Sequence, residues 1–338
     1  MRELLKTEHL SVSFFTKSGE VEAVRDVSLT VEEGEVLAIV GESGCGKSAL
    51  CKSIMKLLPK TAKIKSGKIL ADGIDITDYT QRNMSRLRGD LFSMIFQDPM
   101  TALNPTMTIG KQIEEAVRIH NKKMPKKQVK KKVLELMQLV EIDEPEVRIS
   151  QYPHEFSGGM RQRAVMAIAL AGNPKILFAD EPTTALDVTI QAQILDVFRR
   201  IQKKLGMATV FISHDLGVVA GVADRVAVMY AGKIVEIGTA EEIFYDPRHP
   251  YTWGLLQSLP ILSRGKEWLP TLPGMPPTLI HPPKGDAFAE RNAYAMRIDY
   301  EKEPPVFQVT DTHYAATWLL DERAPKVKAP IGERRYGK

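Results

Sequence analysis

The feature that most constrains this chain is an eight-residue segment rich in glycine, Gly41-Glu42-Ser43-Gly44-Cys45-Gly46-Lys47-Ser48. The segment fits the pattern G-x-x-x-x-G-K-[ST], with one further glycine in its middle. An apolar run at 36–40 precedes it and predicts a buried strand, and residues 49–55 after it have helical spacing. A strand, a glycine-rich loop and a helix are what a phosphate-binding loop requires, whereas a glycine-rich turn that fits by chance lacks these neighbours.

This loop predicts a site for the phosphates of a nucleotide. Its glycines let backbone N–H groups converge on an anion without side-chain clashes, and the start of the helix adds unpaired N–H donors. Lys47 can reach the β- and γ-phosphates, and the Ser48 hydroxyl can bind Mg²⁺. We therefore expect residues 41–48 and the helix residue Ala49 to hold the nucleotide.

Length and charge limit the class of protein. A chain of 338 residues can form one large domain with an appendage, or two domains. The net charge of +4 is too mild to predict nucleic-acid binding. The N-terminus lacks the apolar core of a signal peptide, and no apolar run is long enough to span a bilayer. Since Cys45, one of two cysteines, lies inside the loop, we expect no structural disulfide and a reducing compartment.

The order of the remaining patterns predicts an α/β protein. Apolar and polar residues alternate over 4–40, which indicates antiparallel strands. Buried strands at 92–96, 174–182 and 208–215 alternate with helices, which indicates a mostly parallel sheet with polar residues at its carboxyl edge. The lysines of 122–132 form a basic face, usually just solvated surface. From Asp246 onward prolines become frequent, which predicts a second, loop-rich module.

Polar residues follow three of the buried strands. Asp180 ends one strand and is expected to hold Mg²⁺, while Glu181 is placed to polarise a water in line with the γ-phosphate. Taken alone, this acid pair would more simply indicate the N-cap of a helix that begins at Pro182. Gln97 and His214 follow buried strands on either side of the pair in sequence. Together with the phosphate loop, the set favours catalysis.

With these residues in place, the chain resembles the ATP-binding cassette (ABC) ATPases over roughly residues 4–260. Six motifs occur in the family's order: a Walker A loop at 41–48, a Q-loop at 96–99, a signature motif at 156–162, a Walker B strand at 176–182, a D-loop at 185–187 and a switch histidine at 214. The resemblance implies an ABC-type P-loop NTPase with a mostly parallel core sheet, an antiparallel β subdomain and a helical subdomain at about 98–165. It places the ATPase domain at 1–260 and a loop-rich C-terminal extension at 261–338.

The resemblance also implies roles for the site residues. Catalysis of ATP hydrolysis is expected from Lys47, Gln97, Glu181 and His214. Mg²⁺ is expected on Ser48, Gln97 and Asp180. A second cassette would contribute Ser157, Gly158, Gly159 and Asp187 to the same ATP. The signature motif departs from its commonest form at Phe156 and Met160, which we expect to be packing positions.

In this family an aromatic residue of the first strand stacks on the adenine ring. Phe14 aligns best with that position, and Phe15 is the alternative. Either residue could instead be ordinary packing of the sheet.

The C-terminal part resembles one branch of the family, the oligopeptide, dipeptide and nickel permease ATPases, and most closely its D-type subunits. The matching segments are 96–105, 248–256 and 273–277. The resemblance implies import of oligopeptides, with docking through residues 97–150 onto two transmembrane permease subunits at the cytoplasmic face of a bacterial plasma membrane. It also implies a paralogous ATPase subunit as partner and indirect action with an extracellular peptide-binding protein.

One departure from these relatives is clear. Many of them carry four tail cysteines that fit an iron–sulfur cluster, and the corresponding residues here are Asp286, Asn292, Asp299 and Thr317. Because such clusters need thiolates, we expect no cluster. Packing must then order the tail, and the candidate residues are Phe288, Tyr294, Met296, Phe307, Tyr314 and Trp318.

Two other functions deserve comparison. A soluble ABC ATPase acting on nucleic acid or ribosomes usually carries paired cassettes, zinc motifs or long coiled-coil insertions, none of which the sequence contains. A P-loop kinase would lack the signature motif and His214. Neither the cargo nor the choice between an identical and a paralogous partner cassette follows from the sequence.

Overall fold

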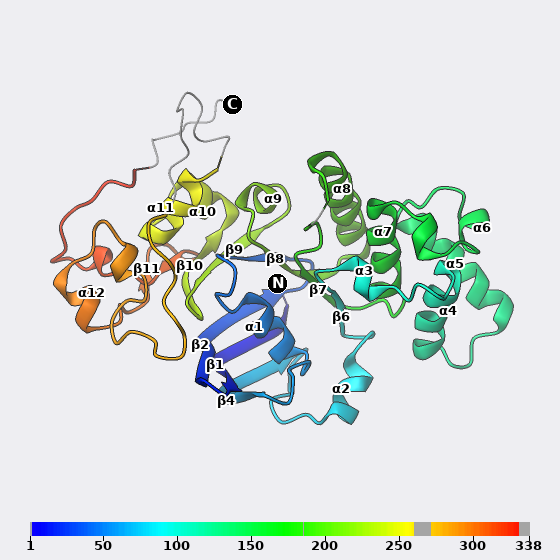
Figure 1. Cartoon of the computed structure of the whole chain (residues 1–338), viewed down its shortest axis with the longest axis horizontal. Helices are drawn as coiled ribbons and strands as arrows, with labels where there is room; N and C mark the ends of the chain where they lie inside the picture. The colour runs from blue at the N-terminus through cyan, green and yellow to red at the C-terminus, as the bar shows by residue number, and fades with distance from the viewer. Residues whose placement is uncertain (1, 185, 260–271, 331–338) are drawn as a thin grey trace. The chain divides into compact units, whose positions relative to one another are not determined.

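The computed structural model describes residues 2–184, 186–259 and 272–330 (Figure 1). They form two compact units. The first unit is built mainly from Asp78–Ile212, and the second from Leu5–Thr30, Leu37–Thr77 and the chain from Ser213 onward. The expected domain boundary at 260/261 and Ala185 of the expected D-loop lie outside the described residues.

The first unit contains three parallel strands, β6 (Phe92–Ile95), β7 (Ile176–Asp180) and β8 (Ala208–Ser213). β7 pairs with β6 along one edge and with β8 along the other. Every residue of β7 and β8 is buried. Parallel strands covered on both faces read as continuous apolar runs, which is why the sequence predicted them correctly.

The helices of this unit are α2 (Gln81–Leu87), α3 (Pro99–Ala102), α4 (Ile109–His120), α5 (Lys126–Leu139), α6 (Pro145–Arg148), α7 (Gly158–Ala169) and α8 (Val188–Leu205), with a short 3₁₀ turn, η1 (Pro153–Glu155). α4 contacts both α5 and α7 (Figure 1). Its buried residues Ile109, Ile113 and Val117 recur every four positions, which makes one apolar stripe. In the described ranges, no helix combines the length and the apolar character needed to cross a membrane.

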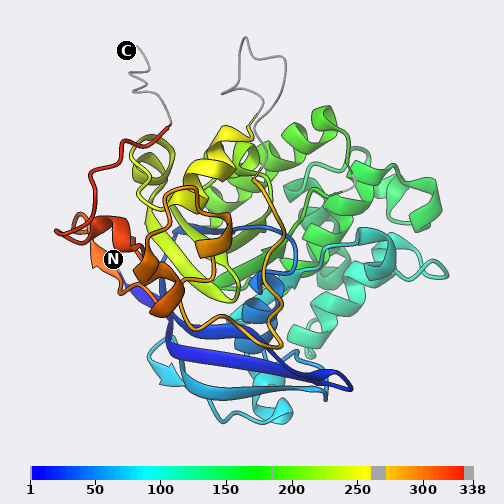
Figure 2. The same ribbon diagram turned by 60° about the vertical axis from the view of Figure 1, so that its left-hand side comes forward.

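The second unit begins with an antiparallel sheet of four strands in the order β2-β1-β4-β5: β1 (Glu3–Thr16), β2 (Gly19–Glu32), β4 (Ala62–Ala71) and β5 (Ile74–Asp75). β1 pairs antiparallel with β4, and β4 with β5. These strands lie side by side at the bottom of Figure 2. The predicted antiparallel sheet is confirmed.

A second set of strands in this unit carries the phosphate loop. β3 (Val36–Val40) pairs parallel with β9 (Arg225–Tyr230), and β9 forms an antiparallel hairpin with β10 (Lys233–Thr239). The helices around them are α1 (Lys47–Ile54), α9 (Leu216–Ala220), α10 (Ala240–Tyr245) and α11 (Pro250–Gln257). The loop between β3 and α1 is the strand-to-helix connection that the sequence predicted.

The tail beyond residue 272 joins the same set of strands. β12 (Tyr314–Ala315) pairs antiparallel with β10, and β11 (Phe307–Gln308) pairs with β12. Short helical turns complete it: η3 (Ala289–Arg291), α12 (Arg297–Glu301) and η4 (Trp318–Leu320). The tail therefore adds two short strands to the sheet, while most of its other described residues lie in turns and loops.

The interior of the tail is more polar than expected. Of the six side chains proposed to pack it, only Phe288 is fully buried, and the other five are half-buried. The buried positions include instead the four that replace cysteines, Asp286, Asn292, Asp299 and Thr317. Each accepts a backbone N–H, from Phe288, Tyr294, Met296 and Leu319 respectively. Local hydrogen bonds thus order the tail alongside apolar packing.

Candidate functional site

The phosphate loop has a backbone that requires glycine at two positions. Gly41 has φ 155°, and a Cβ added there would lie 2.1 Å from the carbonyl oxygen of Met229. Gly46 caps α1 with φ 109°, and its Cβ would lie 2.2 Å from the carbonyl oxygen of Ala23. L side chains rarely adopt such φ values, and neither carbonyl has room to give way. The glycines of the pattern are thus explained by close backbone contacts as well as by phosphate access.

Lys47 and Cys45 lie buried within this loop. The Lys47 ammonium donates hydrogen bonds to the carbonyl oxygens of Gly41, at 2.7 Å, and Glu42, at 2.9 Å. Burial raises the pKa of the Cys45 thiol, and Cys45 and Cys51 are both free. Ser48 follows as the second residue of α1, half-buried beside Ala49.

The acid pair belongs to the first unit, at the end of β7. Asp180 is 2% exposed, and Glu181 follows with φ 48° in the left-handed region. The Glu181 carboxylate accepts hydrogen bonds from the Gln97 amide, at 3.0 Å, and the Thr184 hydroxyl, at 2.9 Å. The structure therefore brings together Gln97 and Glu181, two of the predicted catalytic residues, from positions 84 apart in sequence.

His214 is in the second unit, as are Lys47 and Ser48. It directly follows β8 and is exposed. The next residue, Asp215, caps α9 by accepting N–H groups from Gly217 and Val218. The predicted position of the histidine, at the end of a buried strand, is confirmed.

The predicted signature motif forms the start of α7. Ser157 is its N-cap, and its hydroxyl accepts the N–H of Met160 at 3.3 Å. Gly159 is packed closely, since an added Cβ would lie 2.7 Å from the Ile190 side chain. Phe156 is buried and Met160 is half-buried, consistent with the packing roles expected for them. Ser157 and Gly158 remain exposed at a helix start, where an anion can reach N–H groups.

Asp187 has a structural role of its own at the start of α8. Its carboxylate accepts the N–H of Ile190 at 3.0 Å, which makes it the helix N-cap. N-cap hydrogen bonds of this kind typically contribute about 1 kcal/mol to stability. Any contact across a dimer interface would come in addition to that role.

The two candidate adenine-stacking residues lie next to each other on β1. Phe14 is half-buried opposite Ala62 of β4. Phe15 is 40% exposed, with the ammonium groups of Lys63 and Lys65 at 5.8 and 5.5 Å from its ring centroid. Successive side chains of a strand point to opposite faces, so only one of the two can face a given ligand.

Two residues from the C-terminal part of the chain contact the phosphate loop, and the sequence did not predict either contact. Tyr251 of α11 accepts the backbone N–H of Glu42 with its hydroxyl at 2.8 Å. Arg291 of η3 binds the Glu42 carboxylate through two hydrogen bonds of 2.7 and 2.8 Å. Tyr251 lies in a segment that the sequence singled out for its family resemblance, but no pattern around Arg291 indicated this contact.

Comparison with known proteins identifies the family of this chain. The family model described as ABC transporter matches residues 24–184, and the model described as the oligopeptide/dipeptide transporter C-terminal region matches residues 235–298. The "Oligopeptide transport ATP-binding protein OppD" of Bacillus subtilis is 59% identical over 97% of this chain and 92% of that protein. This chain belongs to the ABC transporter family. The "Dipeptide transport ATP-binding protein DppD" of Lactococcus lactis is 57% identical over 96% of this chain and 93% of that protein.

Solved structures of ABC cassettes have the same fold. The ATP-binding cassette MJ0796, solved as a dimer in a post-hydrolysis state bound to ADP and Pi, matches with a TM-score of 0.63 at 26% identity, over 70% of this chain and 99% of that chain. The cbiO1 protein of Clostridium perfringens matches with a TM-score of 0.64 at 29% identity, over 73% of this chain and 92% of that chain. The predicted α/β P-loop NTPase fold is confirmed, and the chain is an ABC ATPase whose nucleotide is ATP.

Proposed function

We propose that this ABC ATPase energises the import of oligopeptides through a membrane permease, from the cytoplasmic face of a bacterial plasma membrane. The observation that carries the proposal is the C-terminal region of oligopeptide/dipeptide transporter type, which follows the cassette in the same chain. In this proposal the chain pairs with a paralogous ATPase subunit and binds two transmembrane permease subunits. An extracellular peptide-binding protein acts on it only indirectly, and nucleic acid is not a partner.

The hydrogen bond between Gln97 and Glu181 supports a catalytic role for both residues. We assign Glu181 to polarise the water that attacks the γ-phosphate, because a carboxylate can accept the proton that the water loses. Gln97 and Thr184 both donate to one carboxylate oxygen, Oε2, which fixes the orientation of the carboxylate. Lys47 would neutralise phosphate charge, and His214 would contact the γ-phosphate at the end of its strand.

The donor set fits Mg²⁺. This ion prefers oxygen ligands, and the proposed residues offer a hydroxyl from Ser48, a carboxylate from Asp180 and an amide oxygen from Gln97. Bound Mg²⁺ would offset negative charge on the β- and γ-phosphates. Asp180 is the last residue of β7, Ser48 is the second residue of α1, and Gln97 lies two residues after β6, so regular structure positions each donor.

The exposed start of α7 supports a second anion site that acts on another subunit's ATP. Ser157, Gly158 and Gly159 present N–H groups and a hydroxyl there, and Asp187 would join them from the start of α8. Two cassettes would then close around two ATP molecules and reopen after hydrolysis, and the motion would perform work on the permease.

We assign adenine stacking to Phe14. Its neighbour already has two lysine ammonium groups beside its ring, which favours a surface role for Phe15. Phe14→Ala should weaken ATP binding about tenfold, as expected for loss of one aromatic stacking contact, and the matched variant Phe15→Ala should leave it within about twofold. Isothermal titration of both variants with ATP measures the difference, and an equal effect would contradict the assignment.

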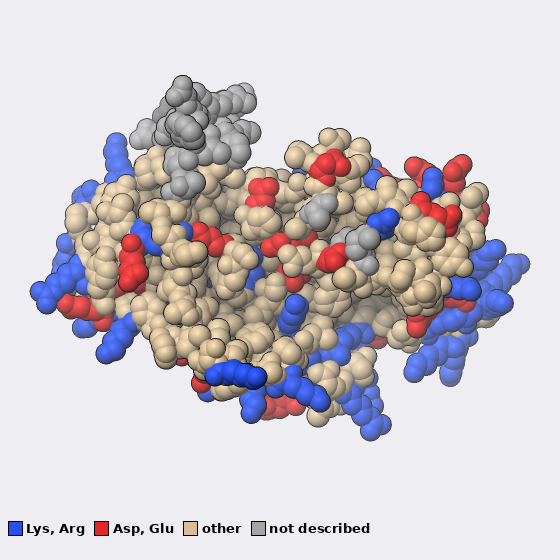
Figure 3. Space-filling model, viewed as in Figure 1, with Lys and Arg blue, Asp and Glu red and all other residues tan. Residues whose placement is uncertain are grey.

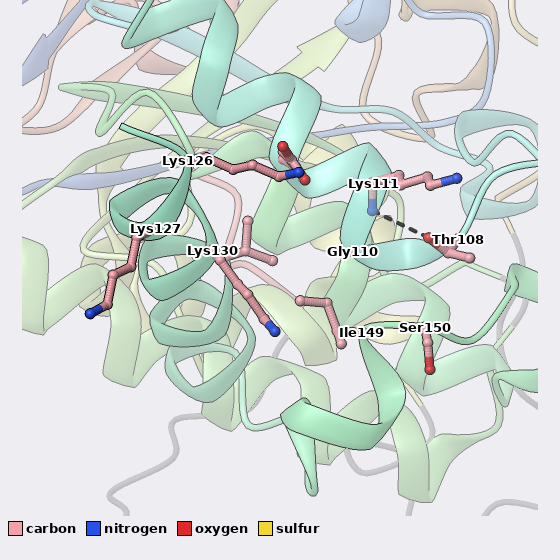
Figure 4. Close-up of a pocket in the computed structure, with 10 residues that line it drawn as sticks. Thr108, Gly110, Lys111, Lys126, Lys127, Lys130, Ile149 and Ser150 are labelled. Carbon is pink, nitrogen blue, oxygen red and sulfur yellow. Dashed lines mark hydrogen bonds between the residues drawn. The ribbon is translucent and has the colours of Figure 1, made fainter. Parts of the chain in front are cut away.

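The helical part of the first unit, within residues 97–150, is the proposed docking region for the permease. A cavity of about 570 Å³ opens there between α4 and α5, with Val133, Ile149 and Gly110 among its lining (Figure 4). Lys111 of α4 and Lys126, Lys127 and Lys130 of α5 surround it, and Glu114 is the acid that lines it. Figure 3 shows basic side chains gathered over this end of the unit. An apolar floor with a basic rim fits an amphipathic, acidic helix of a permease.

Purification from bacterial membranes tests the proposal. The chain, tagged at its N-terminus and expressed in its host, should bring down a second ATPase subunit and two membrane-spanning subunits. ATPase activity of the isolated complex should rise when a peptide-loaded binding protein is added. A chain that instead co-purifies with ribosomes or DNA, with activity stimulated by nucleic acid, would contradict peptide import and favour the soluble alternative.

A further inference from the structure

The second residue of the phosphate loop, Glu42, is held from three directions. Its N–H donates to Tyr251, and its carbonyl oxygen accepts from Lys47. Its carboxylate is bound by Arg291, whose two terminal nitrogens donate to the two carboxylate oxygens. Bidentate pairs of this kind fix direction as well as distance. The backbone that leads into the loop therefore has little freedom to move.

The Arg291 side chain is itself rigidly placed. It is 5% exposed, and its Nε donates to the carbonyl oxygen of Pro273 at 2.7 Å. Its guanidinium lies over the rings of Tyr230 and Phe288, at 5.7 and 5.9 Å from their centroids. Both rings are fully buried, and both contact Tyr251. The hydrogen bond to Glu42 raises the pKa of Arg291, so the guanidinium stays charged.

A carboxylate beside a triphosphate site needs compensation. Glu42 stands at the second position of a loop that binds an anion, and its negative charge would repel the phosphates. The guanidinium of Arg291 cancels that charge and turns the carboxylate toward the tail. A buried charge left without its partner is strongly unfavourable, so each of these two residues depends on the other.

We propose that Arg291 is a positioning residue for ATP binding, and that the tail sets the affinity of the phosphate loop for ATP through the Arg291–Glu42 ion pair. The proposal rests on the ATPase function of this site and not on the identity of the cargo. Among the residues that the structure describes, Arg291 bonds to the predicted nucleotide site through Glu42. The aromatic residues Tyr230, Tyr251 and Phe288 pack around the pair, so side chains of the tail contact the loop through this cluster.

Steady-state ATPase kinetics of full-length variants test the proposal. Arg291→Gln should raise the KM for ATP about tenfold with kcat changed less than about twofold, because the loop is affected and the catalytic carboxylate is not. Arg291→Lys keeps the charge but cannot form the bidentate pair, and should show about a threefold rise. The effect of Arg291→Gln should shrink at high salt, since part of it is electrostatic.

Two controls separate positioning from general attachment of the tail. Glu303 also ties the tail to the core, through Arg25 and Lys233, without touching the loop. Glu303→Gln should therefore leave the KM for ATP unchanged. In a Glu42→Gln background, which removes the carboxylate charge, Arg291→Gln should change KM by less than about twofold.

Three results would overturn the proposal. An unchanged KM in Arg291→Gln would do so, as would an equal rise in Glu303→Gln. So would an undiminished effect of Arg291→Gln in the Glu42→Gln background, because Arg291 would then act through the tail in general. A wild-type chain that fails to bind ATP would instead overturn the ATPase function itself, and the ion-pair proposal with it.

Discussion

At the level of single residues, Glu181 combines an unusual backbone with two hydrogen bonds. A non-glycine residue at φ 48° carries some strain, and here the hydrogen bonds from Gln97 and Thr184 hold it in place. Glu181→Gln keeps the size of the side chain but removes the base. It should bind ATP normally, accumulate a closed dimer and hydrolyse ATP at a rate lower by about a hundredfold or more.

Phosphate release and gel filtration with ATP measure these two outcomes. Glu144 is a matched control, because it also has a left-handed backbone, with φ 49°, and is exposed in the same unit. Glu144→Gln should hydrolyse ATP at the native rate. A native rate in Glu181→Gln would show that another group takes the proton from water.

For a second residue, Asp286, we expect a buried carboxylate that lowers stability at neutral pH. Burial raises its pKa from 3.8 to about 6, and the nearby acids Asp299 and Glu303 add to the rise. As pH increases from about 4 to about 6 the unfolded chain loses this proton first, so folding becomes less favourable, and above about pH 6 the loss is complete. At about 1.4 kcal/mol per pH unit, the cost reaches about 3 kcal/mol.

Asp286→Asn should remove that cost while keeping the hydrogen bond to the Phe288 N–H. Urea unfolding should find the variant more stable than wild type by about 1–3 kcal/mol at pH 7.5, and equal to it near pH 4. Asp321→Asn is the control, because hydrogen bonds from Arg323 lower the pKa of Asp321 to about 2, and it should not gain stability. A pH-independent gain in Asp286→Asn would contradict the titration argument.

The residues that the sequence predicted differ in kind from those it missed. Lys47, Asp180 and Ser157 each lie in a contiguous sequence motif, and the spacing of such a motif predicts the local backbone structure. Arg291 contacts Glu42 from 249 positions away, and an arginine in a segment without regular apolar spacing has no local signature. The buried Asp286 and Asp299 were also beyond prediction, because acids are rarely buried and only the folded tail shows which ones are.

At the level of elements, strand and helix types were predictable wherever burial was regular. β7 and β8 read as apolar runs because both faces are covered, and α4 read as a helix because one stripe is buried. The short strands β11 and β12 were missed. Two residues each are too few to show a period, and their pairing depends on the edge that β10 offers.

The groove between α4 and α5 gives a prediction about docking. Reversing the charge of two lysines at its rim, with Lys126→Glu and Lys130→Glu together, should weaken association with the permease about tenfold or more. The reason is that an acidic partner would be repelled. ATP binding should not change, since the groove lies away from the phosphate loop in sequence and in a different unit. Co-purification and ATP titration measure the two quantities.

The matched control changes the same number of charges nearby. Lys122 and Lys131 are exposed residues of the same basic stretch that do not line the groove. Lys122→Glu with Lys131→Glu should leave permease association within about twofold. An equal loss in both pairs would mean that net charge, and not the groove, controls association.

At the level of the whole molecule, the tail completes the second unit. β12 covers the edge of β10, and Glu236 of β10 is 1% exposed and bonded to His313 at 2.8 Å. Removing the tail would take His313 from this buried carboxylate, leaving it the backbone N–H groups of Arg248 and His249, and would leave β10 as an open edge. An open edge strand pairs readily with other chains, so we expect aggregation.

A chain that ends at residue 258 should therefore be largely insoluble, or melt well below the full chain, even though it retains the cassette motifs. A chain that ends at residue 330 is the control, because it keeps every tail contact described above, and it should match the full chain. Soluble yield and thermal midpoint measure both truncations. A soluble 258-residue chain with a native midpoint would show that the cassette folds alone and that the tail only adds to it. The expected failure would instead show that this cassette needs the contacts of the tail with β10 in order to fold stably.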